Sequence, residues 1–467
     1  MQNLDRLKEI VGPQGFSEDP AEIAPLVEDW RGRHGNSPLL LKPATTEQVS
    51  AILAACHESG TPVVPQGGNT GLAGGQMAQG EVLLSLKRMN RVLDVDAEGM
   101  TMTAEAGVVL AEVQARADQA GLLFPLTLAS EGSCTVGGNI STNAGGNHVL
   151  RYGMMRALVL GLEVVLADGR VLPMLKKLHK DNTGYDLRQV FIGSEGTLGV
   201  VTKAVLRLFP KPVQQVVAFA AVPDPQAALA LLGRMQAATG GLLSAFELVP
   251  RIAVDLVTRH IPGTRDPLAD ASPWYVLIEV SGGEGADLRE LAQSALESAI
   301  EHGEVTDATV AQNHAQAREL WRIREGISES QKREGASIKH DISVPVARFP
   351  EFIAEATAAV TMKFPGARPV TFGHLGDGNL HFNFNAPVGG DAGFLAQWDE
   401  MQLTVHDIVK RYDGSISAEH GIGNTKRDLL PRYKSHEELD AMRLMKQAFD
   451  PKNILNPGKI VPKVARL

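Results

Sequence analysis

The chain has 467 residues, which exceeds what one ordinary hydrophobic core accommodates and predicts two or three domains. Its 45 basic and 54 acidic residues give a formal net charge of −9, which argues against nucleic acid or an anionic membrane as the main partner. The two cysteines exclude a disulfide framework. Without a signal-peptide pattern or a long apolar run, we expect a cytoplasmic protein that is not an integral membrane protein.

The first domain is expected to cover residues 1–212 and to combine short strands, helices and glycine-rich turns. Thr45 and Gln48 predict a capped helix that ends at Gly60, since apolar residues from Val49 to Cys56 repeat at helical spacing. Further strands are expected over 62–64, 82–86, 158–166 and 200–208, and a further helix over 108–120.

The second domain is expected to cover residues 213–415, where glycine becomes rarer, and to be α+β as well. Long helices are expected over 227–239, 287–301 and 312–333, and strands over 274–280, 337–345 and 367–372. The remaining segment, 416–467, is expected to be mainly helical.

Three glycine-rich segments, residues 65–75, 130–146 and 193–201, mark the first domain. The first follows a strand directly, and successive glycines let backbone amides converge on an anion such as a pyrophosphate. It has neither GxGxxG nor GxxxxGK[ST] spacing, so a Rossmann site and a nicotinamide dinucleotide are disfavoured. The second segment mixes small residues with hydroxyl and amide groups, which suits close approach to a large flat ligand.

Two histidines, His374 and His381, flank a Gly-Asp-Gly-Asn turn in a segment that predicts a β-hairpin. After the turn, His381 and Asn383 alternate with phenylalanines, which places the polar residues on one face and the aromatic residues in the core. Glu419 and His420 add a carboxylate and another titratable ring. Three N/O ligands beside a base suit a catalytic divalent metal, although spacing alone leaves two unrelated exposed histidines as the alternative.

The three glycine-rich segments, in this order and spacing, resemble the FAD-binding domain of the vanillyl-alcohol oxidase/p-cresol methylhydroxylase superfamily. The resemblance covers nearly the whole chain and is greatest to its FAD-dependent D-2-hydroxyacid dehydrogenases, D-2-hydroxyglutarate dehydrogenases in particular. It implies an α+β fold with a two-subdomain FAD-binding domain, a cap domain with an antiparallel sheet, and a C-terminal helical segment that returns to the flavin.

The resemblance also implies non-covalent FAD, because Asn69 stands where several relatives have the histidine that attaches the flavin. The implied FAD-binding residues are Gln66, Gly67, Gly68, Asn69, Thr70, Gly71 and Leu72 at the pyrophosphate, Ser133, Gly137, Gly138, Ser141, Thr142, Asn143 and Gly145 along the isoalloxazine and ribityl chain, Val201 near the adenine, and Asn456 at the flavin.

By the same resemblance, His374, His381 and Glu419 bind a divalent metal, zinc before manganese or cobalt, and His420 is the catalytic base. The metal would bind the hydroxyl and carboxylate of a D-2-hydroxyacid and lower the pKa of the hydroxyl. His420 would then take the proton and FAD the hydride. Asn383 would form a hydrogen bond with the substrate.

Arg324 and Lys339 match the family positions that bind a second carboxylate, which favours D-2-hydroxyglutarate and its oxidation to 2-oxoglutarate. Ser328 lies four residues after Arg324 on a predicted helix, so the two should share a face, and it stands where hydroxyglutarate enzymes often have threonine. D-lactate or another D-2-hydroxyacid is the alternative substrate, and a glycolate-oxidase-like subunit or a non-redox flavin transferase is the alternative class. We expect an electron-transfer flavoprotein or a quinone as electron acceptor, and a homodimer.

Overall fold

The computed structural model describes residues 2–29, 32–285, 287–390 and 393–462. The chain divides into two compact units, of which the first comprises residues 1–146, 153–211 and 419–467. The second comprises residues 147–152 and 212–418. No helix in the described ranges is long and apolar enough to cross a membrane.

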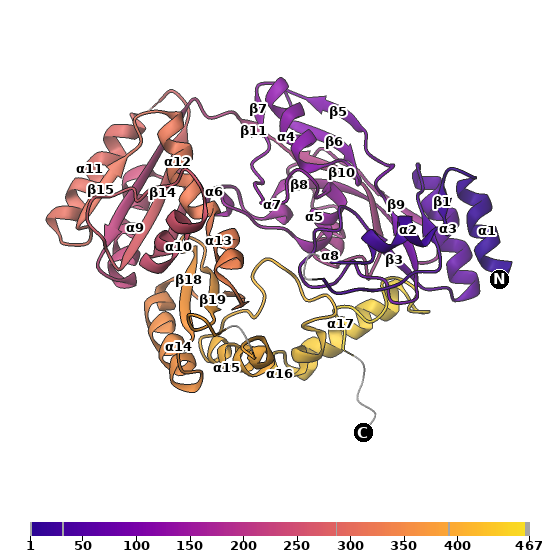
Figure 1. Ribbon diagram of the computed structural model, residues 1–467. Coiled ribbons are helices and arrows are strands. Elements are labelled where there is room, and N and C mark those ends of the chain that lie inside the picture. Colours follow the sequence, from indigo (N-terminus) through magenta and orange to yellow (C-terminus); the bar gives the residue numbers. More distant parts are fainter. Residues whose placement is uncertain (1, 30–31, 286, 391–392, 463–467) are drawn as a thin grey trace. The chain divides into compact units, whose positions relative to one another are not determined.

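The first unit contains two larger sheets (Figure 1). One has the order β1-β2-β4-β3, in which β2 and β3 both run parallel to β4. The other has the order β5-β6-β10-β8-β9 and is antiparallel throughout. The strands are β1 (Phe16–Ser17), β2 (Leu40–Leu41), β3 (Val63–Gln66), β4 (Val82–Ser85), β5 (Val92–Asp96), β6 (Thr101–Glu105), β7 (Leu122–Leu123), β8 (Val159–Val165), β9 (Val171–Met174), β10 (Val200–Arg207) and β11 (Phe209–Pro210).

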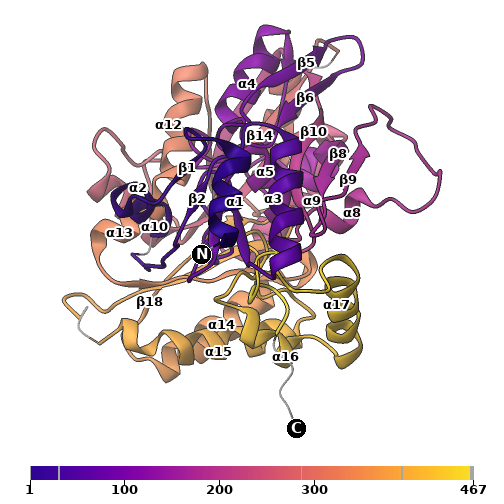
Figure 2. The ribbon, with the colours of Figure 1, turned by 90° about the vertical axis from the view of Figure 1, so that its right-hand side faces the viewer.

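The helices of the first unit include two from the end of the chain, α16 and α17 (Figure 2). They are α1 (Gln2–Val11), α2 (Pro20–Ile23), α3 (Thr46–Ser59), α4 (Leu110–Gln119), α5 (Val136–Thr142), α7 (Met155–Leu158), α8 (Arg188–Phe191), α16 (Leu430–Tyr433) and α17 (His436–Phe449), with short 3₁₀ turns at Ala24–Leu26 and Arg427–Leu429. Helix α3 begins and ends as predicted. The Thr45 hydroxyl accepts a hydrogen bond from the backbone N–H of Gln48, and Gly60 ends the helix in the left-handed conformation.

The second unit is a large antiparallel sheet covered on both faces by helices. Its strands follow the order β15-β12-β14-β13-β18-β19-β16, and β17 pairs with β19 beside β16. They are β12 (Gln214–Val222), β13 (Leu243–Pro250), β14 (Trp274–Gly282), β15 (Asp307–Val310), β16 (Ser337–Ile338), β17 (Asp341–Ser343), β18 (Arg368–His374) and β19 (Asn379–Asn385). Because both faces are covered, β12 to β14 are buried almost without interruption.

The helices of the second unit are α6 (Val149–Tyr152), α9 (Pro225–Thr239), α10 (Arg251–His260), α11 (Leu288–Glu301), α12 (His314–Glu325), α13 (Ile327–Glu334), α14 (Phe349–Lys363) and α15 (Trp398–Arg411), with 3₁₀ turns at Val346–Arg348 and Leu395–Gln397. The predicted single helix over 312–333 is wrong. It is interrupted at Gly326, and Arg324 and Ser328 therefore lie on different helices, with Arg324 buried and Ser328 exposed. The predicted strand over 337–345 is likewise divided into β16 and β17.

One face of this sheet changes from apolar to polar along its strands. Val249, Tyr275 and Phe372 belong to an apolar core that α10, α12 and α13 cover. Two residues further along β13 and β18, the same face carries Glu247 and His374, since side chains alternate between the two faces. The polar end of this face is where the predicted metal ligands and substrate-binding residues gather.

Candidate functional site

The first two glycine-rich segments lie against each other in the first unit. A methyl group added to Gly67 would lie 2.2 Å from Oγ1 of Thr135, and one added to Gly68 would lie 2.1 Å from the carbonyl oxygen of Ser133. Neither glycine has room for a side chain, because Gly67 packs against the Thr135 side chain and Gly68 against the backbone of the second segment. A cavity of about 350 Å³ opens beside this contact, and its lining includes Ser133, Thr135 and Lys87.

Buried oxygens without hydrogen-bond partners mark the same region. Within the described part of the chain, no partner is found for Oε1 of Gln66, Oδ1 of Asn69, Oγ1 of Thr135 or Oδ1 of Asn456. Leaving such a group unsatisfied costs about 1–3 kcal/mol each, so these four oxygens are suited to a ligand with several polar groups. The adenine amine and the ribityl hydroxyls of FAD can donate to the amide oxygens, and its pyrophosphate can accept from the Thr135 hydroxyl, so the residues present fit that cofactor.

The third glycine-rich segment and the C-terminal segment complete this region. The backbone N–H of Glu195 donates to the carbonyl of Ser141 at 2.8 Å. Its buried carboxylate accepts hydrogen bonds from the backbone N–H groups of Ile422 and Gly423, at 2.8 and 2.9 Å. Burial raises the pKa of Glu195. The Asn456 side chain donates to the carbonyls of Gly75 and Glu195, at 2.8 and 2.7 Å, so the structure brings Asn456 to the glycine-rich segments.

The remaining residues predicted for FAD follow these segments. Asn69 has a φ of 61° and donates from Nδ2 to the carbonyl of Glu28 at 3.0 Å. Gly137, Gly138, Ser141 and Thr142 lie on α5, with Asn143 as its left-handed C-cap. Val201 is buried in β10. Thr70, Gly71 and Leu72 continue the first segment. A methyl group added to Gly145 would lie 2.5 Å from Oε1 of Glu419, so the second segment passes directly beside that carboxylate.

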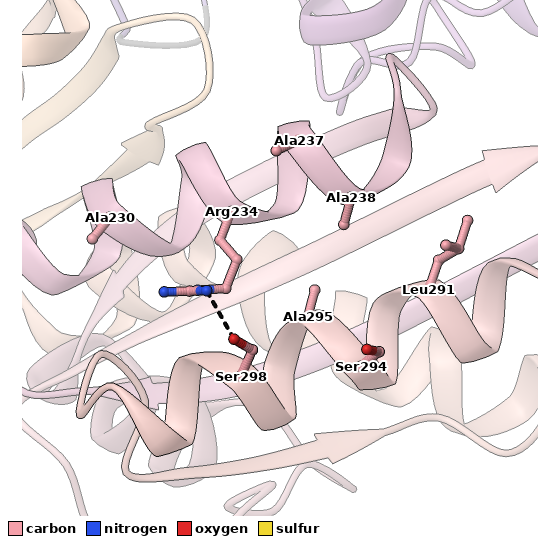
Figure 3. Close-up of a pocket in the computed structure, with 8 residues that line it drawn as sticks. All are labelled: Ala230, Arg234, Ala237, Ala238, Leu291, Ser294, Ala295 and Ser298. Carbon is pink, nitrogen blue, oxygen red and sulfur yellow. Dashed lines mark hydrogen bonds between the residues drawn. The ribbon is translucent and has the colours of Figure 1, made fainter.

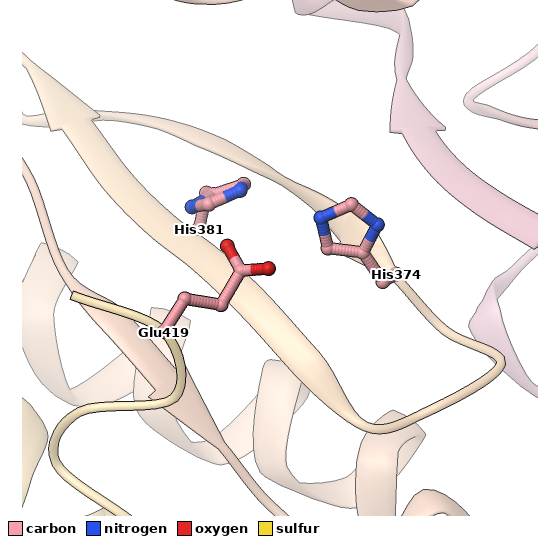
Figure 4. A group of neighbouring side chains, drawn as sticks. All are labelled: His374, His381 and Glu419. Carbon is pink, nitrogen blue, oxygen red and sulfur yellow. The ribbon is translucent and has the colours of Figure 1, made fainter. Parts of the chain in front are cut away.

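His374 and His381 lie on neighbouring strands of the hairpin, as predicted, with their ring centroids 5.7 Å apart. Glu419 follows Ala418, whose backbone N–H donates to the carbonyl of Asp341 beside β19. One ligand atom from each of His374, His381 and Glu419 can lie within 4.8 Å of the others, and Figure 4 shows these side chains turned toward one another. Two imidazoles and a carboxylate with an open fourth position suit a catalytic zinc or a similar ion.

Asp341, Glu419 and His420 form a second group whose ligand atoms lie within 4.8 Å of one another. The carboxylate of Asp341 also accepts a hydrogen bond from Nδ2 of Asn379 at 3.1 Å. His420 is therefore next in the chain to a candidate ligand and close to a second carboxylate, an arrangement that favours an imidazole accepting a proton.

Glu247, which the sequence analysis did not single out, lies behind His374. Its two carboxylate oxygens accept hydrogen bonds from Nδ1 of His374 and from Nε of Arg324, both at 2.7 Å. Burial alone would raise the pKa of Glu247, but attraction to His374 and Arg324 outweighs it and lowers the pKa to about 2. The one available signal was a single carboxylate within the apolar run of residues 243–250.

The predicted substrate-binding residues are placed differently from one another. Lys339 is half-buried and lies between β16 and β17, whose residues Ser337 and Asp341 pair with Asn385 and His381 of β19.

Asn383 is buried on the face of β19 that carries His381. It accepts a hydrogen bond from the backbone N–H of His340 at 3.1 Å and donates to Gln331 at 3.0 Å. Gln331 therefore holds the Asn383 amide, a role that no pattern in the sequence indicates. Ser328 is exposed on α13 and does not share the position of Arg324.

A cavity of about 590 Å³ lies between α9 and α11 in the second unit (Figure 3). Small side chains line most of it. Its Arg234 binds Ser298 through Nη1 at 2.9 Å and both oxygens of Glu304 at 2.8 and 2.9 Å. This paired arginine and the surrounding alanines offer no metal ligand and no acid or base, so we assign no chemistry to it.

Comparison with known proteins covers both halves of the chain. A family model described as "FAD linked oxidases, C-terminal domain" matches residues 211–460, and one described as "FAD binding domain" matches residues 38–174. The solved structures of p-cresol methylhydroxylase and of alkyldihydroxyacetonephosphate synthase superpose with TM-scores of 0.76 and 0.74 at 15% and 17% identity. The matches cover 99% and 98% of this chain, and 97% and 84% of those chains, and show a common fold.

Curated relatives are similar over nearly the full length. The mitochondrial D-2-hydroxyglutarate dehydrogenase of Bos taurus is 43% identical over 98% of this chain and 83% of its own. The D-2-hydroxyglutarate dehydrogenase of Xanthomonas citri pv. viticola is 40% identical over 97% of this chain and 96% of its own. A putative mitochondrial D-lactate dehydrogenase of Schizosaccharomyces pombe is 37% identical over 98% and 90%.

The fold and the glycine-rich site define an FAD-dependent oxidoreductase with a vanillyl-alcohol oxidase-type FAD-binding domain. The chain belongs to the FAD-linked oxidase family, and its resemblance to the FAD-dependent D-2-hydroxyacid dehydrogenases is confirmed.

Proposed function

We propose that the protein oxidises D-2-hydroxyglutarate to 2-oxoglutarate with FAD and a divalent metal, zinc before manganese or cobalt. The observation that carries the proposal is that the candidate metal ligands His374 and His381 share a sheet face with Glu247, whose carboxylate holds the cation Arg324 of α12. The relatives named D-2-hydroxyglutarate dehydrogenase, at 40–43% identity, support the same substrate.

The chemistry assigns separate tasks to the two cofactors and to the base. His374, His381 and Glu419 would hold a divalent metal, which would supply a Lewis acid that lowers the pKa of the substrate hydroxyl. FAD, when bound, supplies the hydride acceptor. His420 accepts the hydroxyl proton, and a base in this role typically contributes about 10²- to 10⁴-fold in rate.

The second substrate carboxylate is assigned to Arg324 and Lys339. Nε of Arg324 donates to Glu247, and the two terminal nitrogens of a guanidinium are suited to binding an anion. A planar guanidinium can bind a carboxylate with two parallel hydrogen bonds, and Lys339 adds a point charge. Asn383 has a donor hydrogen beyond the one given to Gln331, and we assign it a supporting hydrogen bond to the substrate.

Anaerobic flavin reduction tests the proposal directly. D-2-hydroxyglutarate should bleach the flavin absorbance of the purified protein, and the L-enantiomer should not. Prior treatment with a chelator should abolish bleaching without releasing FAD, and added zinc should restore it. Flavin that stays oxidised with D-2-hydroxyglutarate and zinc present would refute the proposal.

D-lactate is the second candidate, favoured by the Schizosaccharomyces pombe relative and by the exposed position of Ser328. Faster bleaching by D-lactate than by D-2-hydroxyglutarate would select it. A flavoprotein subunit of a glycolate-oxidase-like complex would bleach only with its partners present. We propose an electron-transfer flavoprotein or a quinone as the acceptor, to be distinguished by following reoxidation with each.

A further inference from the structure

The carboxylate of Glu247 joins two groups that the proposed function uses separately. One oxygen accepts a hydrogen bond from Nδ1 of His374 and the other from Nε of Arg324, each at 2.7 Å. An ionised carboxylate can only accept, so His374 carries its proton on Nδ1. The nitrogen with a lone pair for a metal is then Nε2.

This arrangement is fixed by the sheet. Glu247 and His374 are direct partners in the antiparallel pairing of β13 with β18, and the side chain of Glu247 is fully buried. Arg324 reaches the same carboxylate from α12, and its guanidinium carbon lies 4.9 Å from the ring centroid of Phe372. Movement of the Glu247 carboxylate would therefore disturb the metal ligand and the cation together.

We infer that Glu247 is a positioning residue that orients His374 for the metal and Arg324 for the second substrate carboxylate, and so couples the two binding events. The inference rests on the proposed function. A carboxylate behind a histidine ligand fixes the tautomer and raises the basicity of the ligand, and its loss typically weakens metal binding about 10- to 100-fold. Loss of the same carboxylate removes the group that holds Nε of Arg324.

The first experiment measures zinc affinity by competition with a chromophoric chelator, without turnover. Glu247→Gln should bind zinc about 10- to 100-fold more weakly than the wild type. Glu279→Gln is the matched control. Glu279 is buried on the same sheet face but holds His148 and Trp321 instead of a metal ligand. This control should keep the wild-type zinc affinity, and both variants should retain FAD, whose site lies in the first unit.

The second experiment compares kcat/KM at saturating zinc. In Glu247→Gln, kcat/KM should fall further for D-2-hydroxyglutarate than for D-lactate, because only the dicarboxylate binds to Arg324. The inference would be overturned if Glu247→Gln bound zinc as tightly as the wild type, or if Glu279→Gln lost as much zinc affinity as Glu247→Gln. Either result would leave the proposed function standing. A wild-type protein that binds no zinc, manganese or cobalt would overturn the metal site of the proposed function and the inference together.

If Glu247→Gln does not fold, as judged by circular dichroism, Glu247→Asp replaces it. Aspartate keeps the charge but is one methylene shorter, so it cannot reach both partners without a backbone shift. Weaker zinc binding is expected, and an unchanged affinity in this variant would overturn the inference.

Discussion

Replacing Gly68 by alanine should weaken FAD binding while leaving the second unit intact. The added methyl would lie 2.1 Å from the carbonyl oxygen of Ser133 and 2.9 Å from Cα of Cys134, whereas ordinary contacts begin at 3.4 Å. Both obstacles are backbone atoms, so one loop must retreat by about 1.3 Å. Strain of this kind costs about 1–3 kcal/mol, which corresponds to an FAD affinity roughly 5- to 150-fold lower.

The assay is reconstitution of the FAD-free protein, followed by quenching of flavin fluorescence. Gly233→Ala is the control, because Gly233 lies on α9 in the second unit, away from the glycine-rich segments, and has nothing within 4 Å of its added methyl. The control should bind FAD like the wild type. If Gly68→Ala also kept wild-type affinity, the contact between the two glycine segments would not define the cofactor site.

Two further predictions concern the second unit. Lys339→Met should lower kcat/KM for D-2-hydroxyglutarate about 10- to 100-fold and for D-lactate far less, since a hydrogen bond to a charged group contributes about 1.5–3 kcal/mol; equal losses would exclude a dicarboxylate at Lys339. Hydrogen bonds from His260 and Arg368 lower the pKa of Glu334 from 4.5 to about 2, so its stabilisation is complete above pH 4.5 and is lost as the pH falls toward 2. Glu334→Gln should therefore destabilise the protein by about 2–3 kcal/mol at pH 7 and progressively less below pH 4.5, as measured by urea unfolding; a difference independent of pH would contradict the assignment.

The sequence predicted correctly those elements that are specified by residues close together in the chain. Helix α3 was predicted to within a residue because its cap and its apolar spacing lie inside the helix. The hairpin of His374 and His381 was predicted because turn residues and alternation act over a few positions. The break at Gly326 was missed because a glycine inside a periodic pattern is compatible with either one helix or two.

The site was predicted less completely because its supporting contacts are distant in sequence. Glu247 lies 127 residues from His374 and 77 from Arg324. No pattern within β13 reveals which partners a lone carboxylate will meet. The glycine-rich segments could be recognised from the sequence, because the run of glycines that permits close backbone approach lies within each segment.

The return of the chain to the first unit sets the order in which the protein can fold during synthesis. Val63 in β3 forms a parallel bridge with Leu455, and the backbone N–H of Asn456 donates to the carbonyl of Val63 at 2.8 Å. Some 390 residues must therefore leave the ribosome after Val63 before Leu455 and Asn456 can pair with it. Most of the second unit, residues 212–418, emerges as one continuous stretch and can fold before this pairing forms. The pairing of Val63 with Leu455 and Asn456 can form only after these two residues, which follow α17, have left the ribosome.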